Sequence, residues 1–123
     1  MSLEERLENE VTANLITFLV LKCVQQYGRS YGYQMKKFIQ EQTGKSIPEG
    51  TLYPILSKLG DKKPPRYGYL QSFREEVRGG RKRRYYELTE RGKSQLKIWP
   101  EKWLELNEFV QTILGRLNIE KEG

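Results

Sequence analysis

The first segment of the chain has the periodicity of a helix. Over residues 3–27, apolar residues recur every three or four positions at Leu3, Leu7, Val11, Leu15 and Phe18. From residue 15 to residue 24, apolar side chains occupy nearly every face, so this half of the helix must be covered from more than one side. In so small a domain, a partner subunit is the natural second cover. Gly28 supplies a signal that ends the helix.

Two shorter helices are predicted next. Ser30 has the side chain of an N-cap, and the helix that it begins ends before Gly44. The buried face of this helix holds Tyr31, Met35, Phe38 and Ile39. A third helix follows Pro48 and runs to about residue 59, with apolar residues at Leu52, Ile55, Leu56 and Leu59. Pro54 lies near its start, where backbone amides are only beginning to find partners, so its cost is modest.

A loop-like segment of residues 60–68 leads into two strand-like runs, residues 69–77 and 82–88. Gly79 and Gly80 join the runs, and we expect them to supply positive φ in the turn of a β-hairpin. Three aromatic or apolar side chains have structural roles here: Tyr86 and Leu88 pack inward, and Tyr85 covers Phe73.

The hairpin is rich in charge. Glu75 and Glu76 would lie opposite or nearly opposite Arg83 and Arg84, and each pair formed across the strands would add little stability. This pairing leaves the unmatched basic residues at the tip of the hairpin, namely Arg78, Arg81 and Lys82.

The last predicted helix begins after Thr89, a candidate N-cap, and runs to about residue 117. Its apolar residues follow a heptad seam: Leu96, Trp99, Trp103, Leu106, Val110, Ile113 and Leu117. Pro100 should kink or divide the helix. A regular seam on a terminal helix requires another helix. That helix is either the first helix of the same chain or one from a partner subunit, and both arrangements hold if two chains exchange these elements. We therefore predict a homodimer. Its interface would hold Leu7, Val11, Leu15, Leu96, Trp103, Leu106, Val110, Ile113 and Leu117.

Composition limits the classes of function. The chain has 123 residues, which is one domain, and it has one cysteine and no histidine. Neither a disulfide within the chain nor a zinc site of the usual kinds can be built from this set, and the commonest general base is missing. No residue grouping supports an enzyme, and we expect no cofactor and no metal. No membrane span or targeting peptide is recognisable, so we expect a cytoplasmic protein.

Charge adds a binding partner. The net charge is +6, but residues 58–86 alone hold ten basic residues against three acidic ones, an excess of seven positive charges. A basic middle between near-neutral or acidic ends is typical of a protein that binds a polyanion. A solvated, loop-rich face would not by itself require such a concentration of charge.

The order of the elements is helix, helix, helix, strand, strand, helix. This order predicts a mainly α fold with a small β-hairpin wing, a winged helix-turn-helix followed by one further helix. Residues 1–89 would form the DNA-binding part with the N-terminal dimerisation helix, and residues 90–123 the C-terminal dimerisation helix, in one compact unit. In such a fold the third helix enters the major groove of double-stranded DNA and the wing reaches flanking DNA.

Three motifs in this order resemble the PadR family of bacterial and archaeal regulators: Tyr31-Gly32-Tyr33, Gly50-Thr51-Leu52-Tyr53-Pro54-Ile55-Leu56, and Gly80-Arg81-Lys82-Arg83-Arg84-Tyr85-Tyr86-Glu87-Leu88-Thr89-Glu90-Arg91-Gly92. The resemblance covers about residues 15–103 and fits the small subfamily with one C-terminal helix. It implies a homodimer with interlocking terminal helices, a repressor role and, in some members, release by a small molecule. The path from residue 59 to residue 68 is several residues longer than the family pattern.

The resemblance carries a DNA-contact role to Thr51 and Tyr53, although Tyr53 has the alternative of packing against the second helix. Tyr33 and Lys36 could clamp a phosphate group, with a partly buried position as the alternative for Tyr33. Lys58 is expected to be exposed and to face phosphate. The full candidate set for DNA is Tyr33, Lys36, Thr51, Tyr53, Lys58, Arg78, Arg81 and Lys82.

Trp99 and Trp103 have two interpretations. They are either the core of the subunit interface or, as the resemblance implies, the lining of a pocket that stacks a small planar aromatic effector. The sequence therefore predicts a DNA-binding repressor with a possible effector. The alternative is a winged-helix architectural, copy-control or protein-recruiting factor without one.

Overall fold

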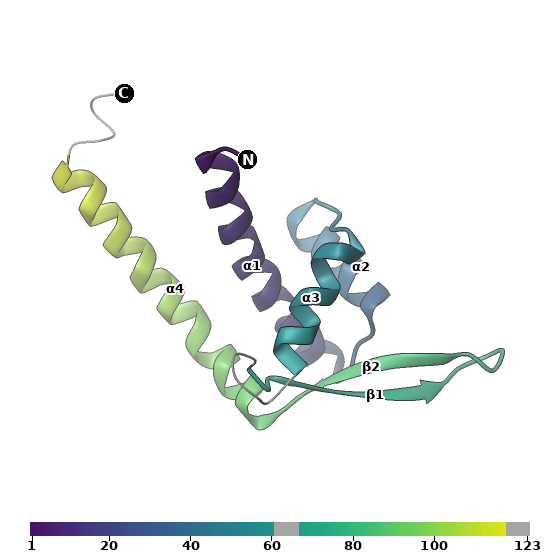
Figure 1. Ribbon diagram of the computed structural model, residues 1–123. Coiled ribbons are helices and arrows are strands. Elements are labelled where there is room, and N and C mark those ends of the chain that lie inside the picture. Colours follow the sequence, from purple (N-terminus) through teal and green to yellow (C-terminus); the bar gives the residue numbers. More distant parts are fainter. Residues whose placement is uncertain (61–66, 118–123) are drawn as a thin grey trace.

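A computed structural model describes residues 1–60 and 67–117 of the chain. Its elements are α1 (Leu3–Tyr27), α2 (Gly32–Thr43), α3 (Glu49–Gly60), β1 (Leu70–Glu76), β2 (Lys82–Leu88) and α4 (Glu90–Leu117) (Figure 1). This is the predicted winged helix-turn-helix with a C-terminal helix. The first helix has the predicted limits, and Gly28 ends it with a φ of 80°.

The core lies between the second half of α1, the helices α2 and α3, and the base of the hairpin. Its most completely buried side chains come from all of these elements: Val20, Leu21, Cys23, Met35, Ile39, Leu52, Leu59 and Leu70. The half of α1 that is apolar on every face is thus covered within its own chain, by α2, α4 and β2. Much of the cover that we assigned to a partner comes from the same chain.

The outer halves of the two terminal helices lack this cover. Figure 1 shows the start of α1 and the end of α4 on the same side of the molecule, away from the tip of the hairpin. Leu3 and Leu7 are 82% and 62% exposed, and Val110 of α4 is 49% exposed. The single chain therefore presents apolar side chains from both terminal helices to solvent.

The start of α2 differs from the prediction. Tyr31, not Ser30, is the N-cap residue, and its amide donates a hydrogen bond to Oε1 of Gln34 at 3.1 Å. Ser30 is completely buried because its backbone forms a bridge with Tyr86 of β2, with N···O distances of 3.0 and 2.8 Å. Its hydroxyl lies 3.6 Å from Sγ of Cys23. Ser30 thus joins the wing to the helices rather than capping one.

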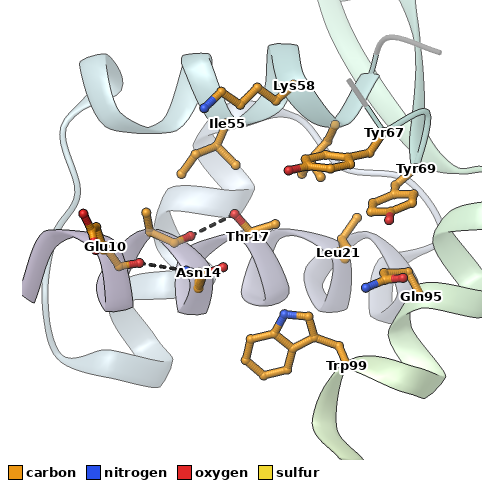
Figure 2. A pocket seen from close by; sticks show the side chains of 12 residues that line it. Glu10, Asn14, Thr17, Leu21, Ile55, Lys58, Tyr67, Tyr69, Gln95 and Trp99 are labelled. Atoms are coloured by element: carbon orange, nitrogen blue, oxygen red, sulfur yellow. Dashed lines mark hydrogen bonds between the residues drawn. The ribbon is translucent and has the colours of Figure 1, made fainter. Parts of the chain in front are cut away.

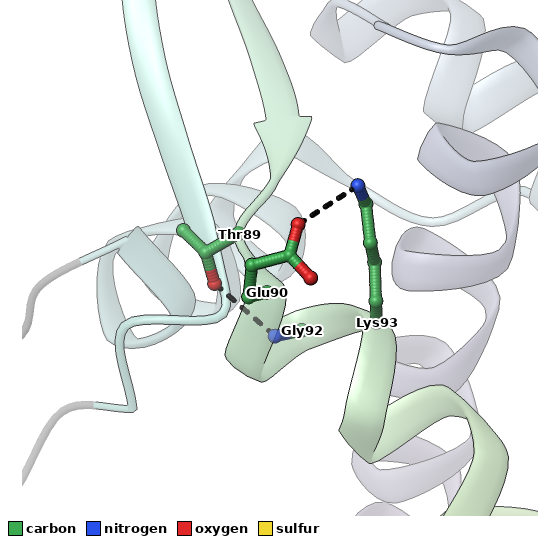
Figure 3. A network of polar contacts seen from close by, with 4 residues as sticks. All are labelled: Thr89, Glu90, Gly92 and Lys93. Atoms are coloured by element: carbon green, nitrogen blue, oxygen red, sulfur yellow. Dashed lines mark hydrogen bonds and ion pairs between the residues drawn. The ribbon is translucent and has the colours of Figure 1, made fainter.

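The last helix begins as predicted but is not divided. Oγ1 of Thr89 accepts a hydrogen bond from the amide of Gly92 at 3.1 Å (Figure 3). The same hydroxyl donates one to the carbonyl of Gly68 at 2.6 Å. Lys93 pairs with Glu90 in the first turn at 3.2 Å. α4 continues through Pro100 to its end, since a proline removes one backbone hydrogen bond and the flanking turns keep theirs.

The two strands form an antiparallel hairpin in which Gly79 and Gly80 have φ values of 88° and 78°, as predicted. Tyr86 is buried, and Tyr85 stacks on Phe73 with 5.9 Å between ring centroids. Both predictions for these side chains are confirmed.

The predicted charge pairs of the hairpin are wrong. Glu75 lies opposite Arg83 in the register, but its carboxylate binds Arg29 at 2.7 Å. The Arg83 guanidinium lies over the ring of Tyr31, 3.9 Å from its centroid, and Arg84 donates to Oγ of Ser72 at 3.0 Å. Glu75 and Arg83 bind residues outside the hairpin, Arg29 and Tyr31, instead of each other. The strand register alone does not include these partners.

The long connection between α3 and β1 includes residues 61–66, which lie outside the described residues. Its far end is tied back to α3. The amide of Tyr67 donates to the carbonyl of Lys58 at 3.0 Å, and the amide of Tyr69 donates to the carbonyl of Leu59 at 2.8 Å. The wing therefore starts against the last turn of α3 despite the extra length of the connection.

Candidate nucleic-acid interface

The buried residues of α3 determine which of its residues face solvent. Leu52, Leu56 and Leu59 are at most 2% exposed and anchor the helix on the core. Helical geometry then turns Pro54 and Ser57 toward solvent, and both are exposed. This exposed side is the part of α3 that can enter a DNA groove.

Tyr53 lies at the edge of this exposed side, and about half of its surface (49%) is accessible. Its phenol oxygen reaches the first residue of α2, because a Cβ added to Gly32 would lie 2.9 Å from that oxygen. The hydroxyl end thus rests on the start of α2, and the rest of the residue keeps an accessible surface. The packing interpretation therefore describes the hydroxyl end of Tyr53, and DNA contact through its accessible surface stays a prediction.

The Tyr86 phenol is buried at the base of the wing. Burial raises the pKa of Tyr86 above its ordinary value; the charge of Arg84 acts against this rise, and Tyr53 adds to it. A phenol is already neutral at physiological pH at its ordinary pKa, and burial keeps the Tyr86 hydroxyl further from ionisation.

Thr51 and Lys58 occupy the other flank of α3. Thr51 is half-buried and lines a hollow of about 600 Å³ between α3, the start of α1 and residues 45–48. Lys58 is exposed, as predicted, and lines a second hollow beside α1 and α4. These two residues therefore do not share the flank of Tyr53.

On α2, Tyr33 and Lys36 are three residues apart and so lie on one side of the helix. Tyr33 is 70% exposed, so it does not belong to the core, and Lys36 is half-buried. Tyr33 directly follows Gly32, on which Tyr53 rests. The start of α2 and the start of α3 thus present two tyrosines to solvent close together.

The tip of the wing carries the basic residues that we predicted there. The turn is closed by the Val77 amide, which donates to the Arg81 carbonyl at 2.8 Å. Arg78, Arg81 and Lys82 are all exposed around it. Figure 1 shows the tip projecting well past the helices, where it can reach a polyanion without moving the core.

Sequence reasoning missed two further cations. Arg74 and Arg84 lie directly opposite each other in the register, and both are exposed. Like charges in such a pair repel each other, and a bound phosphate would relieve the repulsion. The signal was present in the sequence, because strand alternation puts Arg74 and Arg84 on the face of Leu70 and Tyr86, and Glu75 on the other face.

The seam of α4 divides into a covered and an uncovered part. Leu96 is 6% exposed and belongs to the core of its own chain, so little of it is left for a partner. The later seam residues stay open: Leu106, Val110, Ile113 and Leu117 are between 39% and 59% exposed. Phe109 beside them is 62% exposed.

The two tryptophans form an aromatic stack at the boundary between these parts. Trp99 stacks on Phe18 of α1 with a centroid distance of 4.4 Å, and Trp103 stacks on Trp99 at 5.4 Å. Trp99 also lines a hollow of about 430 Å³, together with Tyr69 and Lys58 (Figure 2). An aromatic hollow therefore borders the flank of α3 that carries Lys58.

Within residues 1–60 and 67–117, no group of three or more acidic or cysteine side chains lies close enough together to hold a metal ion. None of the helices in these ranges is long and apolar enough to cross a membrane.

Comparisons with known proteins match this arrangement. The sequence model of the transcriptional regulator PadR-like family matches residues 20–98. A structure from Streptococcus mutans is 36% identical, with a TM-score of 0.63, over 84% of this chain and 89% of that one. A transcriptional regulator from Clostridium thermocellum is 27% identical, with a TM-score of 0.69, over 84% and 96%. A PadR family transcription regulator from Clostridium difficile is 26% identical, with a TM-score of 0.61, over 83% and 96%.

The family match spans the second half of α1, the helix-turn-helix, the wing and the start of α4. It therefore includes every described element that positions α3 and the basic hairpin. The match with this chain covers 89% to 96% of the length of these three structural neighbours. The chain belongs to the PadR-like family of transcriptional regulators, and its winged helix is that of a DNA-binding regulator of transcription.

Proposed function

We propose that the protein is a homodimeric repressor that binds a specific operator, with α3 in the major groove and the wing on flanking DNA. One observation carries the proposal: the basic wing starts against the last turn of α3, because the amides of Tyr67 and Tyr69 donate to the carbonyls of Lys58 and Leu59. The helix that would read the groove and the arm that would bind phosphate are thus joined at the base of the wing. Base edges would be read by α3, and the wing would add affinity that is independent of sequence.

Selection of bound duplexes from a random pool, followed by methylation protection, tests the proposal. We expect a pseudo-palindromic site with half-sites about one helical turn apart, which mirrors a two-fold symmetric protein. Placing that site over a promoter should lower transcription from a reporter. Protection of one unsymmetrical half-site would contradict the dimeric docking, and increased transcription would contradict the repressor role.

The alternative is a winged-helix architectural, copy-control or protein-recruiting factor that responds to no small molecule. Binding that stays indifferent to sequence at moderate salt would favour an architectural factor. Operator-specific binding that no small molecule changes would favour a constitutive regulator. The hollow beside Trp99 is the observation that favours an effector.

Homodimerisation should be visible in solution. The open seam of α4 and the start of α1 expose apolar surface that one small domain leaves uncovered. Sedimentation at micromolar concentration should give about twice the chain mass of 14.6 kDa. Val110→Asp should shift the protein toward the mass of one chain, because it buries an unpaired charge. Gln111→Asp, one residue away and off the seam, is the control that should remain dimeric; a parent protein that stays monomeric would refute this.

Effector binding should be reported by Trp103. Trp99 already stacks on two rings, whereas Trp103 stacks on one and lies where the seam becomes open. A planar aromatic compound should quench the tryptophan fluorescence, and Trp103→Ala should weaken that binding more than it weakens DNA binding. Trp103→Phe keeps an aromatic face and should retain most of the affinity. A panel of planar dyes that gives no quenching would leave both tryptophans as packing residues.

A further inference from the structure

Beyond its base, the wing has few contacts with the rest of the chain. The backbone bridge between Ser30 and Tyr86 anchors the hairpin near the pair formed by Tyr86 and Ser72. Farther out, both strands carry mainly exposed residues. A two-stranded hairpin is marginally stable by itself, so its outer half requires a brace to hold one direction.

Arg29 supplies such a brace. Its guanidinium binds the carboxylate of Glu75 at 2.7 Å, and it lies over the ring of Tyr85 at 4.4 Å and near that of Phe73 at 5.7 Å. A planar guanidinium can stack on an aromatic face and hold a carboxylate at its edge at the same time, which an ammonium group cannot do. One side chain thus contacts both strands of the hairpin, outward of the Ser30 bridge.

The backbone on either side holds Arg29 in place. Gly28 turns the chain at the end of α1 with a φ of 80°, and Ser30 is buried and bonded twice to Tyr86. A second cation acts from the opposite direction, since Arg83 of β2 lies over Tyr31 at 3.9 Å, and Tyr31 meets Tyr85 edge to face at 5.5 Å. The turn between α1 and α2 therefore interlocks with the hairpin.

We propose that Arg29 is a positioning residue: through Glu75, Tyr85 and Phe73 it fixes the direction of the wing so that the basic tip meets DNA phosphates while α3 lies in its groove. This proposal rests on the proposed contact between the wing and DNA. Neither Arg29 nor Glu75 touches DNA in it. Their effect on DNA binding passes through the position of Arg81 and Lys82.

Glu75→Gln separates positioning from simple electrostatics, because the two predict opposite signs. Removing a negative charge from a DNA-binding arm would by charge alone tighten binding. Loss of the brace should instead weaken binding to a mixed-sequence duplex by roughly tenfold and make the log–log salt slope shallower by about one to two. Arg29→Lys keeps the charge but loses the planar stack, and it should weaken binding in the same way.

Glu76→Gln is the matched control. It removes the same charge one residue along the strand, from a side chain that lies opposite Lys82. It should tighten binding by about twofold, as electrostatics alone requires. Arg29 and Glu75 have side chains that are 45% exposed, so all three variants should unfold at nearly the parent temperature. If Glu75→Gln binds DNA as tightly as Glu76→Gln, the proposal is overturned.

The direction of the wing can also be measured without DNA. Spin labels on Arg78→Cys at the tip and Gln40→Cys on α2, in chains diluted with unlabelled protein, should give a narrow distance distribution; Cys23 is buried and should not react. Glu75→Gln should broaden it and Glu76→Gln should not. An unchanged distribution in Glu75→Gln overturns the positioning role. If Glu75→Gln broadens the distribution but binds DNA like the parent protein, the direction of the wing does not affect DNA binding and the proposal is overturned. The double variant of Arg81 and Lys82 then shows the source of that result. If it keeps the parent salt slope, the proposed contact between the wing and DNA is itself wrong.

Discussion

Replacing Arg81 and Lys82 together by Ala should make the salt dependence of DNA binding markedly shallower. Both side chains are exposed at the tip of the wing, where the turn closed by Val77 and Arg81 presents them to solvent. Each phosphate that a cation neutralises releases condensed counterions, with a slope of roughly −0.9 per contact. Two cations in each of two subunits make four contacts, so the slope of log affinity against log salt should become shallower by about three to four. All duplex sequences should be weakened alike.

The measurement is a titration of one duplex at several salt concentrations, by fluorescence anisotropy. Lys93→Ala combined with Lys97→Ala is the matched control, because it removes the same charge from the exposed surface of α4, away from the tip of the wing. That control should leave the slope nearly unchanged. Thr51→Ala should also keep the slope, because it removes no charge. A wing variant with the parent slope would mean that the basic hairpin is a solvated face.

Local signals predicted the elements well because each depends on residues that are close in sequence. The spacing of apolar residues placed the helices, and Thr89 and the glycine pair marked a cap and a turn that the structure confirms. Ser30 was misassigned for the opposite reason. A serine before a helix satisfies the local rule for an N-cap. The backbone of Ser30, however, is hydrogen-bonded to that of Tyr86, fifty-six residues away in the chain.

The charges of the hairpin show the same limit. Strand pairing predicted that Glu75 and Glu76 lie opposite or nearly opposite Arg83 and Arg84, and the register puts Glu75 opposite Arg83 and Glu76 opposite Lys82. The cation that Glu75 binds depends on the position of the end of α1, which brings the Arg29 guanidinium within 2.7 Å of the Glu75 carboxylate. The Arg83 guanidinium, which Glu75 does not bind, lies instead over the ring of Tyr31, the N-cap residue of α2. The bracing role of Arg29 therefore follows from tertiary packing, and strand alternation alone could have indicated only the exposed pair of Arg74 and Arg84.

Gly92→Ala should be among the most destabilising single substitutions in the chain. Gly92 is buried in the first turn of α4, and a Cβ there would overlap the backbone carbonyl oxygen of Tyr69 and lie 3.1 Å from Cδ2 of Leu88. That carbonyl cannot move freely, because it accepts the amide of Thr89 at 3.0 Å. The start of β1 thus crosses the start of α4 at a distance that only glycine permits. Relieving the overlap must shift backbone, which should cost about 3 kcal/mol and lower the melting temperature by about 10 °C.

Gly115→Ala on the same helix is the control that separates this overlap from helix propensity. Gly115 is exposed, and a Cβ there would meet nothing within 4 Å. The change should therefore stabilise α4 by up to about 1 kcal/mol, as alanine does in a helix interior. Thermal unfolding followed by circular dichroism at one fixed chain concentration compares the two, since the stability of a dimer depends on concentration. If Gly92→Ala also raised the melting temperature, the close crossing of β1 over α4 would be wrong, and with it the path by which the wing is joined to the last helix.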